Sequence, residues 1–282
     1  MPEQADIHML VRENALDKVE HLLYMQPNTL NKARIRDGAT ALHLSVDKNS
    51  LEMTTMLLSH RPDLLIGNKL TAWNCMHIAA NRGLNDMIDL LVNAAEEQVP
   101  KLIPPKAPAL PEKKGANKEY ELERINQQSV AQALIDKETL DEYEKLKFEA
   151  KMKILTAKDK DGMTPTLVAC VAGHVHTVEL LVDKYKVLPN ALNNMGDGPL
   201  HISSYWNRID LVEYLLGLSP AFCVDVKKQN IHGNTPLHRA CQKGNAEIAN
   251  MLALHGANML AINYEGLTPM DVSHPDIVKK LR

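Results

Sequence analysis

Two side chains in the segment GNTPLHRACQKGN, residues 233–245, could in principle form a catalytic pair. Cys241 would be the nucleophile and His238 the base that takes the proton from its thiol. A working pair of this kind needs a third group that orients the base. No such group is placed by the sequence, so the segment needs a second interpretation.

That interpretation comes from repetition, because the segment recurs in degraded form along the chain. One slot of the repeated pattern holds His43, His77, His201 and His238, with Leu167 and Asp271 in two further copies. Most neighbouring slots lie 33 to 37 residues apart, and each full copy is followed by a run that ends in paired aliphatic residues. A period of this length indicates stacked units, none of which can bury its apolar face alone.

The residues of one unit predict a pair of helices. Gly233 permits a turn that needs a positive φ. Thr235 is a good N-cap and Pro236 a good first helical residue, because its missing N–H would have no partner in the first turn. Gly244 ends this first helix, and AEIANMLALHG gives a second helix that Gly256 ends.

These units resemble the ankyrin repeat, whose Thr-Pro-Leu-His signature stands here at residues 235–238, and the resemblance covers most of the chain. It implies an all-α solenoid of helix–turn–helix repeats with β-hairpin fingers, interrupted by a helical insertion. It also implies a concave groove that binds proteins. In that family the histidine holds the hairpin and the helix start together, so His238 is expected to be structural.

The repeat spacing divides the chain into five parts. We expect an N-terminal capping repeat over 1–35, repeats one and two over 36–99, an insertion over 100–157, repeats three to five over 158–264 and a C-terminal capping repeat, ending in a short basic helix, over 265–282. The insertion is indicated by the 90 residues between His77 and Leu167. Its proline-rich start predicts an extended linker, and from about Lys118 it becomes helical. That helical part is either a partner-binding appendage or a lid packed on the repeats.

Composition argues against several other classes of protein. The formal charge of −3 gives no global case for nucleic-acid binding, and no apolar stretch approaches the roughly 20 residues that span a bilayer. The four cysteines are scattered, which favours free thiols in a reducing compartment. With no signal peptide visible at the start, we expect an intracellular, cytoplasmic monomer. Phosphate-binding loops are absent and His174 with His176 falls in a repeat slot, so neither a cofactor nor a metal is expected.

Function in this architecture is expected on exposed positions, since the shared apolar ones are needed for stacking. Aligning the repeats assigns the fingertips and the ends of the first helices to the groove. The candidate partner-binding residues are Arg36, Lys48, Trp73, Arg82, Met163, Val171, Met195, Tyr205, Trp206 and Lys243. The same alignment assigns Asp47 and Asp197 to the groove. Both tryptophans of a chain with only 4% aromatic residues are on this face, and Trp, Tyr and Arg dominate interface hot spots.

Tyr205 and Trp206 are expected to form an apolar patch in the middle of the groove with Met163 and Val171 of the preceding repeat. Exposed apolar patches usually mark contact sites. In the alternative interpretation, these aromatic residues are covered by the helices of the insertion.

The leading hypothesis is therefore a non-enzymatic scaffold or adaptor that binds a partner protein through the groove. One alternative is an effector of an intracellular bacterium that binds and redirects a host protein in the host cytoplasm. Another is a regulatory or targeting subunit of an enzyme, or an enzyme hidden in the insertion. The sequence does not identify the partner, because this fold supports many unrelated functions.

Overall fold

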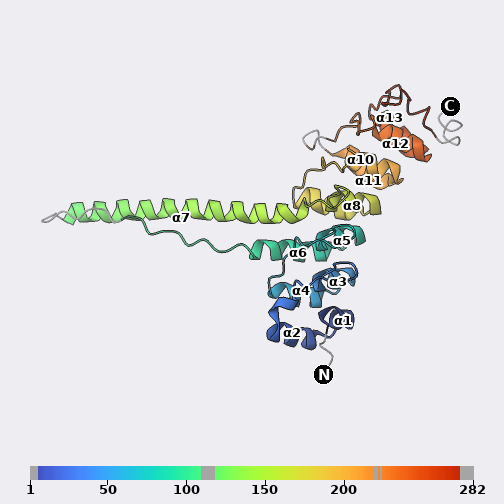
Figure 1. Cartoon of the computed structure of the whole chain (residues 1–282). Coiled ribbons are helices and arrows are strands. Elements are labelled where there is room, and N and C mark those ends of the chain that lie inside the picture. The colour runs from blue at the N-terminus through green and yellow to red at the C-terminus, as the bar shows by residue number, and fades with distance from the viewer. Residues whose placement is uncertain (1–5, 109–117, 219–221, 223, 274–282) are drawn as a thin grey trace.

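The computed structural model describes residues 6–108, 118–218, 222 and 224–273, which form a row of helix pairs with one long projecting helix (Figure 1). The pairs are α1 (Ile7–Arg12) with α2 (Leu16–Met25), α3 (Ala41–Asp47) with α4 (Leu51–Ser59), α5 (Cys75–Arg82) with α6 (Asn85–Glu97), α8 (Pro165–Ala172) with α9 (Val175–Glu179), α10 (Pro199–Tyr205) with α11 (Ile209–Gly217), and α12 (Pro236–Lys243) with α13 (Ala246–Leu254). A short 3-10 helix spans Pro27–Thr29, and α9 runs on into a π-helical turn over Leu180–Lys184. The all-α solenoid predicted from the repeats is thus confirmed.

The first helix of repeat five, α12, starts as the sequence predicts. The Thr235 hydroxyl accepts a hydrogen bond from the His238 amide, and Pro236 is the first residue of α12. Gly244 ends the helix with a φ of 85°, a left-handed conformation that glycine adopts without steric cost. Asn74 replaces threonine as the cap of α5, and its side chain accepts from the His77 amide at 3.2 Å. Repeat two lacks the Thr-Pro of the signature, and an asparagine takes the place of the threonine cap there.

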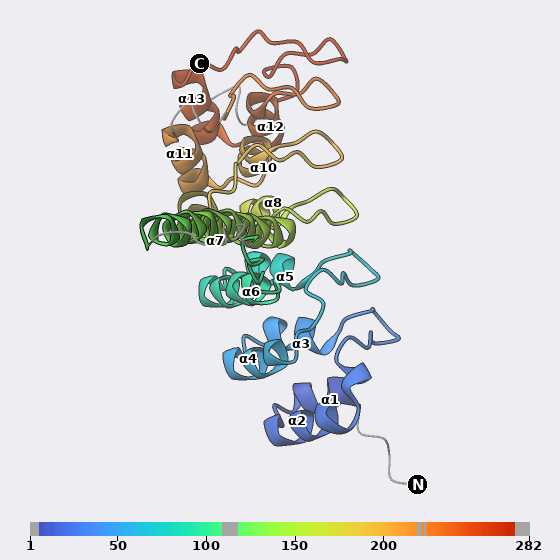
Figure 2. The same ribbon diagram turned by 90° about the vertical axis from the view of Figure 1, so that its left-hand side faces the viewer.

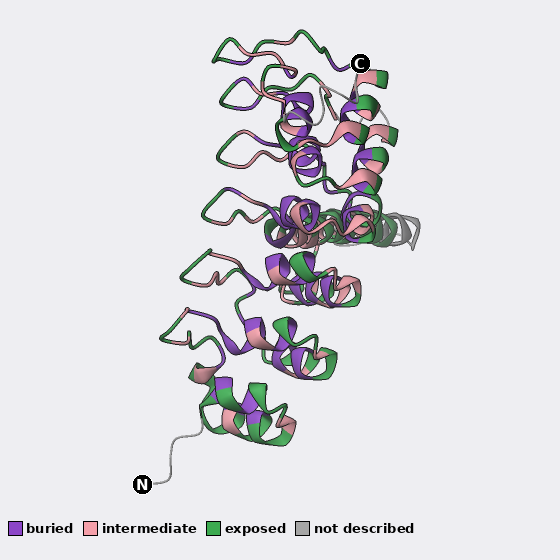
Figure 3. Ribbon diagram, turned by 90° about the vertical axis from the view of Figure 1, so that its right-hand side faces the viewer, coloured by how far each residue is buried: buried purple, intermediate pink, exposed green. Residues whose placement is uncertain are grey.

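The core is aliphatic and runs between the stacked helix pairs. Leu57, Leu91 and Leu155 belong to one cluster of buried residues, and Leu167 and Leu215 belong to a second cluster nearer the C-terminus. All five side chains are completely buried. Figure 3 shows the first helices largely buried while the fingertips are exposed. The repeats therefore use their apolar residues for stacking and leave the fingers to solvent.

The fingers project in a row from one side of the helices (Figure 2). They span 34–39, 68–73, 159–163, 193–197, 230–234 and 263–267, each closed by a backbone hydrogen bond between its ends. Consecutive fingers are joined by one backbone bond each: Lys69 N–H to Asp37 O, Lys160 to Thr71, Asn194 to Asp161, Ile231 to Met195 and Tyr264 to His232, at 2.8–3.1 Å. No strand is assigned within the described residues, so the expected β-hairpins are turns linked by single bonds.

The insertion forms an arm that points away from the repeats (Figure 1). Residues 98–108 leave the end of α6 without regular structure, and the 38-residue helix α7 (Lys118–Leu155) returns, with a length of about 57 Å at 1.5 Å per residue. The end of α7 packs on the repeats: Ile154 and Leu155 are buried, and Lys151 pairs with Glu96 of α6 at 3.2 Å. Halfway along the helix, Gln132 Oε1 accepts from the Ala107 amide at 2.8 Å and Gln132 Nε2 donates to the Pro105 carbonyl oxygen at 3.2 Å. Farther out, the side chains of Ile125, Val130, Leu134 and Leu140 are more than half exposed.

The C-terminal capping repeat is described only in part. Residues 263–267 form a finger, and 268–273 follow as turns rather than as a helix. The short basic helix expected after them lies outside the described residues, as do residues 109–111 at the end of the proline-rich segment and Cys223.

Candidate functional site

The repeated histidine joins each first helix to the finger of the next repeat. In His238, Nδ1 accepts from the Thr235 amide at 3.1 Å and Nε2 lies 3.2 Å from the Leu267 carbonyl oxygen. His43, His77 and His201 repeat this arrangement, with Nε2 2.9–3.1 Å from the carbonyl oxygens of Trp73, Met163 and Asn234. His8 Nε2 likewise lies 2.9 Å from the Lys32 carbonyl oxygen, but its Nδ1 contacts the Asp6 carboxylate at 2.8 Å. The alignment missed His8 because the Thr-Pro-Leu-His signature is absent there.

These environments exclude a Cys–His nucleophile at His238 and Cys241. Burial raises the pKa of the Cys241 thiol to about 11 and lowers the pKa of His238, whose ring nitrogens both have partners. A thiol that stays protonated at neutral pH is a poor nucleophile. Burial likewise raises the pKa of Cys75 and Cys170 to about 12. Among the described residues, no group of three His, Cys, Asp or Glu side chains could hold a metal ion.

A pocket of about 240 Å³ opens in the groove face, which we define as the fingertips together with the C-terminal ends of the first helices. It is lined by Met163, Val171, Asn193, Asp197, Ile202, Tyr205, Trp206 and Arg239, and we call it the Trp206 pocket. The structure therefore brings together four of the predicted residues, from finger 3 and from the ends of α8 and α10. None of the lining residues belongs to α7, so the arm is not the cover that the alternative interpretation required.

The aromatic wall of the Trp206 pocket is held in place by neighbouring cations. Tyr205 and Trp206 meet edge to face, with ring centroids 5.5 Å apart and planes at 78°. The Arg239 guanidinium and the Lys243 ammonium lie 5.3 Å and 4.5 Å from the Tyr205 ring centroid. Cations over a tyrosine face are attracted by its ring quadrupole. Trp206 nevertheless remains 50% exposed, so part of the wall is available to another molecule.

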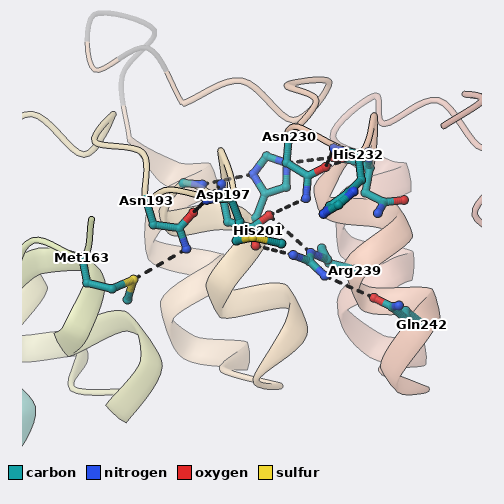
Figure 4. A network of polar contacts seen from close by, with 11 residues as sticks. Met163, Asn193, Asp197, His201, Asn230, His232, Arg239 and Gln242 are labelled. Atoms are coloured by element: carbon teal, nitrogen blue, oxygen red, sulfur yellow. Dashed lines mark hydrogen bonds and ion pairs between the residues drawn. The ribbon is translucent and has the colours of Figure 1, made fainter. Parts of the chain in front are cut away.

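The polar wall of the pocket is a buried ion pair (Figure 4). Arg239 donates through Nη2 and Nε to the Asp197 carboxylate, and Asn230 Nδ2 donates to Asp197 Oδ1 at 2.8 Å. Asp197, which the alignment assigns to the groove, lines the pocket, but only 7% of the residue is accessible because this pair covers its carboxylate. Arg239 directly follows the histidine slot in the sequence, and its side chain reaches finger 4 of the preceding repeat. That position was the sequence signal that could have identified it.

The other predicted residues lie elsewhere along the groove face. Trp73 is half-buried and donates through Nε1 to Asp159 Oδ2 at 2.8 Å, which ties finger 2 to finger 3. Arg82 pairs with Asp47 at 2.7 Å. The structure leaves Arg36, Lys48, Met195 and Lys243 exposed. Of these, Lys243 is beside the Trp206 pocket, Met195 is at the tip of finger 4, and the other two lie towards the N-terminus.

Comparison with known proteins agrees with this architecture. A family model for three copies of the ankyrin repeat matches residues 7–101 and 126–225, and a single-repeat model matches 232–264. The chain belongs to the ankyrin-repeat family. The ankyrin repeat domain of Bcl-3, a solved structure, covers the whole chain with a TM-score of 0.65 at 18% identity, which shows the shared ankyrin fold. No helix of the described ankyrin structure is long and apolar enough to cross a membrane.

Curated relatives are matched over part of their length. Ankyrin repeat and SOCS box protein 11 of Mus musculus is 30% identical over 115 residues, which is 40% of this chain and 33% of that protein. The NAD-dependent deacetylase sir2B of Dictyostelium discoideum is 21% identical over 244 residues, 86% of this chain and 29% of that protein. The chain thus spans about a third of the length of these relatives.

Proposed function

We propose that this ankyrin-repeat chain is a non-enzymatic interaction module that binds a partner protein through the groove face, with the Trp206 pocket as its centre. The observation that carries the proposal is the half-exposed Trp206 beside an open apolar pocket, in a chain where aromatic residues are 4% of the total. Aromatic anchors of this kind supply most of the binding energy at protein interfaces. The predicted residues Met163, Val171 and Tyr205 belong to the same pocket.

The test is a comparison of Trp206→Ala with the parent chain as bait for proteins of a cell lysate. We expect the substitution to weaken partner binding by about 2 kcal/mol or more, since a hot-spot aromatic residue is removed. The matched control is Tyr24→Ala on α2, where an aromatic side chain that is 81% exposed lies far from the pocket.

Thermal unfolding first establishes that both variants are folded. A partner captured by the parent and by Tyr24→Ala, and lost by Trp206→Ala, supports the proposal. Capture of the same partners by all three proteins, with equal affinity, would show that binding occurs outside the Trp206 pocket.

A second candidate is a targeting or regulatory module of an enzyme. It is favoured by the match to sir2B, since 71% of that deacetylase lies outside the matched part. Identification of an enzyme among the partners lost by Trp206→Ala would support it.

The hypothesis of an effector of an intracellular bacterium has no comparable support, and a translocation assay into host cells tests it. Buried free Cys75, Cys170 and Cys241 favour action in a reducing compartment.

A further inference from the structure

The charge of the groove face is opposite in sign to the charge of the whole chain. The chain has a formal net charge of −3. On the groove face, however, exposed cationic side chains occur from the first finger to the last helix pair: Arg36, Lys48, Lys69, Lys160 and Lys243. The face that contains the Trp206 pocket is therefore positively charged.

Three carboxylates of this face are already neutralised by neighbours within the chain. Asp37 pairs with Arg34, Asp47 with Arg82 and Asp197 with Arg239. The carboxylates that remain on the fingers are those of exposed Asp161 and Glu265 and of half-buried Asp159, which accepts a hydrogen bond from the Trp73 indole. At the end of α1, exposed Arg12 and Glu13 offset each other. Positive charge is therefore in excess after the internal ion pairs are counted.

The exposed cations have no carboxylate partner among the described residues. Lys48 Nζ donates to Arg12 O, and Lys160 Nζ donates to Lys69 O at 2.5 Å. An ammonium group carries three donors, and a carbonyl oxygen takes one of them without cancelling the charge. Lys243 lies over the Tyr205 ring, at the rim of the Trp206 pocket. These side chains are held in position and still able to bind an anion.

The size of the pocket limits what enters it. At about 240 Å³ it lies below the range of roughly 300–1,000 Å³ that is typical of sites for drug-sized ligands. Its apolar lining from Met163, Val171, Ile202 and Trp206 suits one bulky aliphatic or aromatic side chain. A single inserted side chain is how a protein partner uses such a pocket.

We infer that the partner of the groove is an acidic protein segment, which places one bulky apolar side chain in the Trp206 pocket and its carboxylates opposite Lys243, Lys48 and the cations of fingers 1–3. This inference rests on the proposed function and adds the chemistry of the partner. Complementary charge across an interface steers association and selects among partners. A nucleic acid is a poorer occupant, because nucleic-acid-binding domains are strongly basic as a whole and this chain is not.

The experiment selects peptides from a phage-displayed library of random dodecapeptides on the full chain. We expect the enriched peptides to carry net negative charge and a bulky apolar residue, and to lose binding to Trp206→Ala. One enriched peptide is then synthesised with a fluorophore. Its dissociation constant should rise at least about tenfold in Lys48→Glu/Lys243→Glu, and also rise with salt.

The matched control is Lys18→Glu/Lys137→Glu, which changes the net charge by the same amount on α2 and α7, away from the groove face. We expect it to bind the peptide like the parent. An equal loss in both double variants would show that only the total charge matters, which overturns the inference.

The remaining outcomes separate the two proposals. Enrichment of neutral or basic peptides that depends on Trp206 overturns the acidic partner and leaves the proposed function intact. Failure to enrich any peptide that discriminates Trp206→Ala from the parent contradicts the proposed function itself. Binding of a random single-stranded DNA oligonucleotide that is lost in Lys48→Glu/Lys243→Glu would replace the acidic segment by a nucleic acid.

Discussion

At the scale of single residues, the ion pair of Arg239 and Asp197 links architecture to the candidate site. Their side chains are 15% and 10% exposed, the lowest values of any carboxylate pair with lysine or arginine in the described part of the chain. Arg239 comes from α12 of repeat five and Asp197 from finger 4 of the preceding repeat, so the pair fixes one repeat against the next. The same guanidinium also lies against Tyr205, which makes the position of the aromatic wall depend on this pair.

Replacing Arg239 by methionine should lower the free energy of unfolding by about 3 kcal/mol, because the Asp197 carboxylate is left buried without a cation. Asp197→Asn/Arg239→Met should recover part of this loss, since the uncompensated charge is gone. Urea unfolding of the parent, both single variants and the double variant measures the coupling. Additive losses in the double variant would mean that the two side chains do not depend on each other.

At the scale of elements, α7 differs from the other helices in that its outer part extends away from the repeats, while its C-terminal part packs against α6 (Figure 1). Its last turn is buried against α6, whereas Val130, Leu134 and Leu140 are more than half exposed. Most helical stability in proteins comes from packing of an amphipathic face rather than from helix propensity. The outer part of the arm therefore depends mainly on its own hydrogen bonds, on ion pairs such as Lys145 with Glu149 at 4.0 Å, and on the bonds of Gln132 to the 105–107 segment.

We expect backbone amides between residues 125 and 145 to exchange with deuterium far faster than those of α5 and α8, which are buried between repeats. Hydrogen exchange followed by mass spectrometry resolves these segments in one experiment. Protection of the outer arm equal to that of α5 would contradict the prediction and would indicate that a further copy or another molecule covers it.

What the sequence predicts at this scale follows from local signals. Thr235, Pro236 and Gly244 mark both ends of α12 as expected, and the residues expected to be helical from about Lys118 belong to α7. The direction of α7 was left open, since its apolar residues suit an appendage or a lid equally. The burial of Asp197 could not be read from its own finger, because its partner Arg239 is 42 residues away in the next repeat.

At the scale of the whole molecule, the repeated histidines make stability depend on pH. Burial lowers the pKa of His43, His77, His201 and His238 below the ordinary value near 6.5. In the unfolded chain these histidines take up protons below about pH 6.5, while the folded chain does not. Unfolding therefore becomes more favourable as pH falls, by up to about 1.4 kcal/mol per pH unit for each histidine within its titration window.

The free energy of unfolding should accordingly fall steeply between pH values of about 6.5 and 5.5, above the range where carboxylates titrate. Urea unfolding at several pH values measures the slope. His238→Gln should reduce the slope, whereas His21→Gln, at an exposed position of α2, should leave it unchanged. A slope of zero across this range in the parent would refute the histidine mechanism.

The position of the arm also affects the order in which the solenoid forms during synthesis. Repeat two ends with α6 at Glu97, and its neighbour α8 ends only at Ala172. At ~5–20 residues per second, a ribosome needs roughly 4–15 s to make the intervening chain. For that interval the apolar face of α5 in the nascent N-terminal repeats is exposed to the surrounding medium. This face includes Ala79 and Ala80 and is covered only later. The growing chain thus passes through a stage in which the N-terminal repeats are complete but α8 has not yet been made. During this stage chaperones have time to bind the uncovered face of α5.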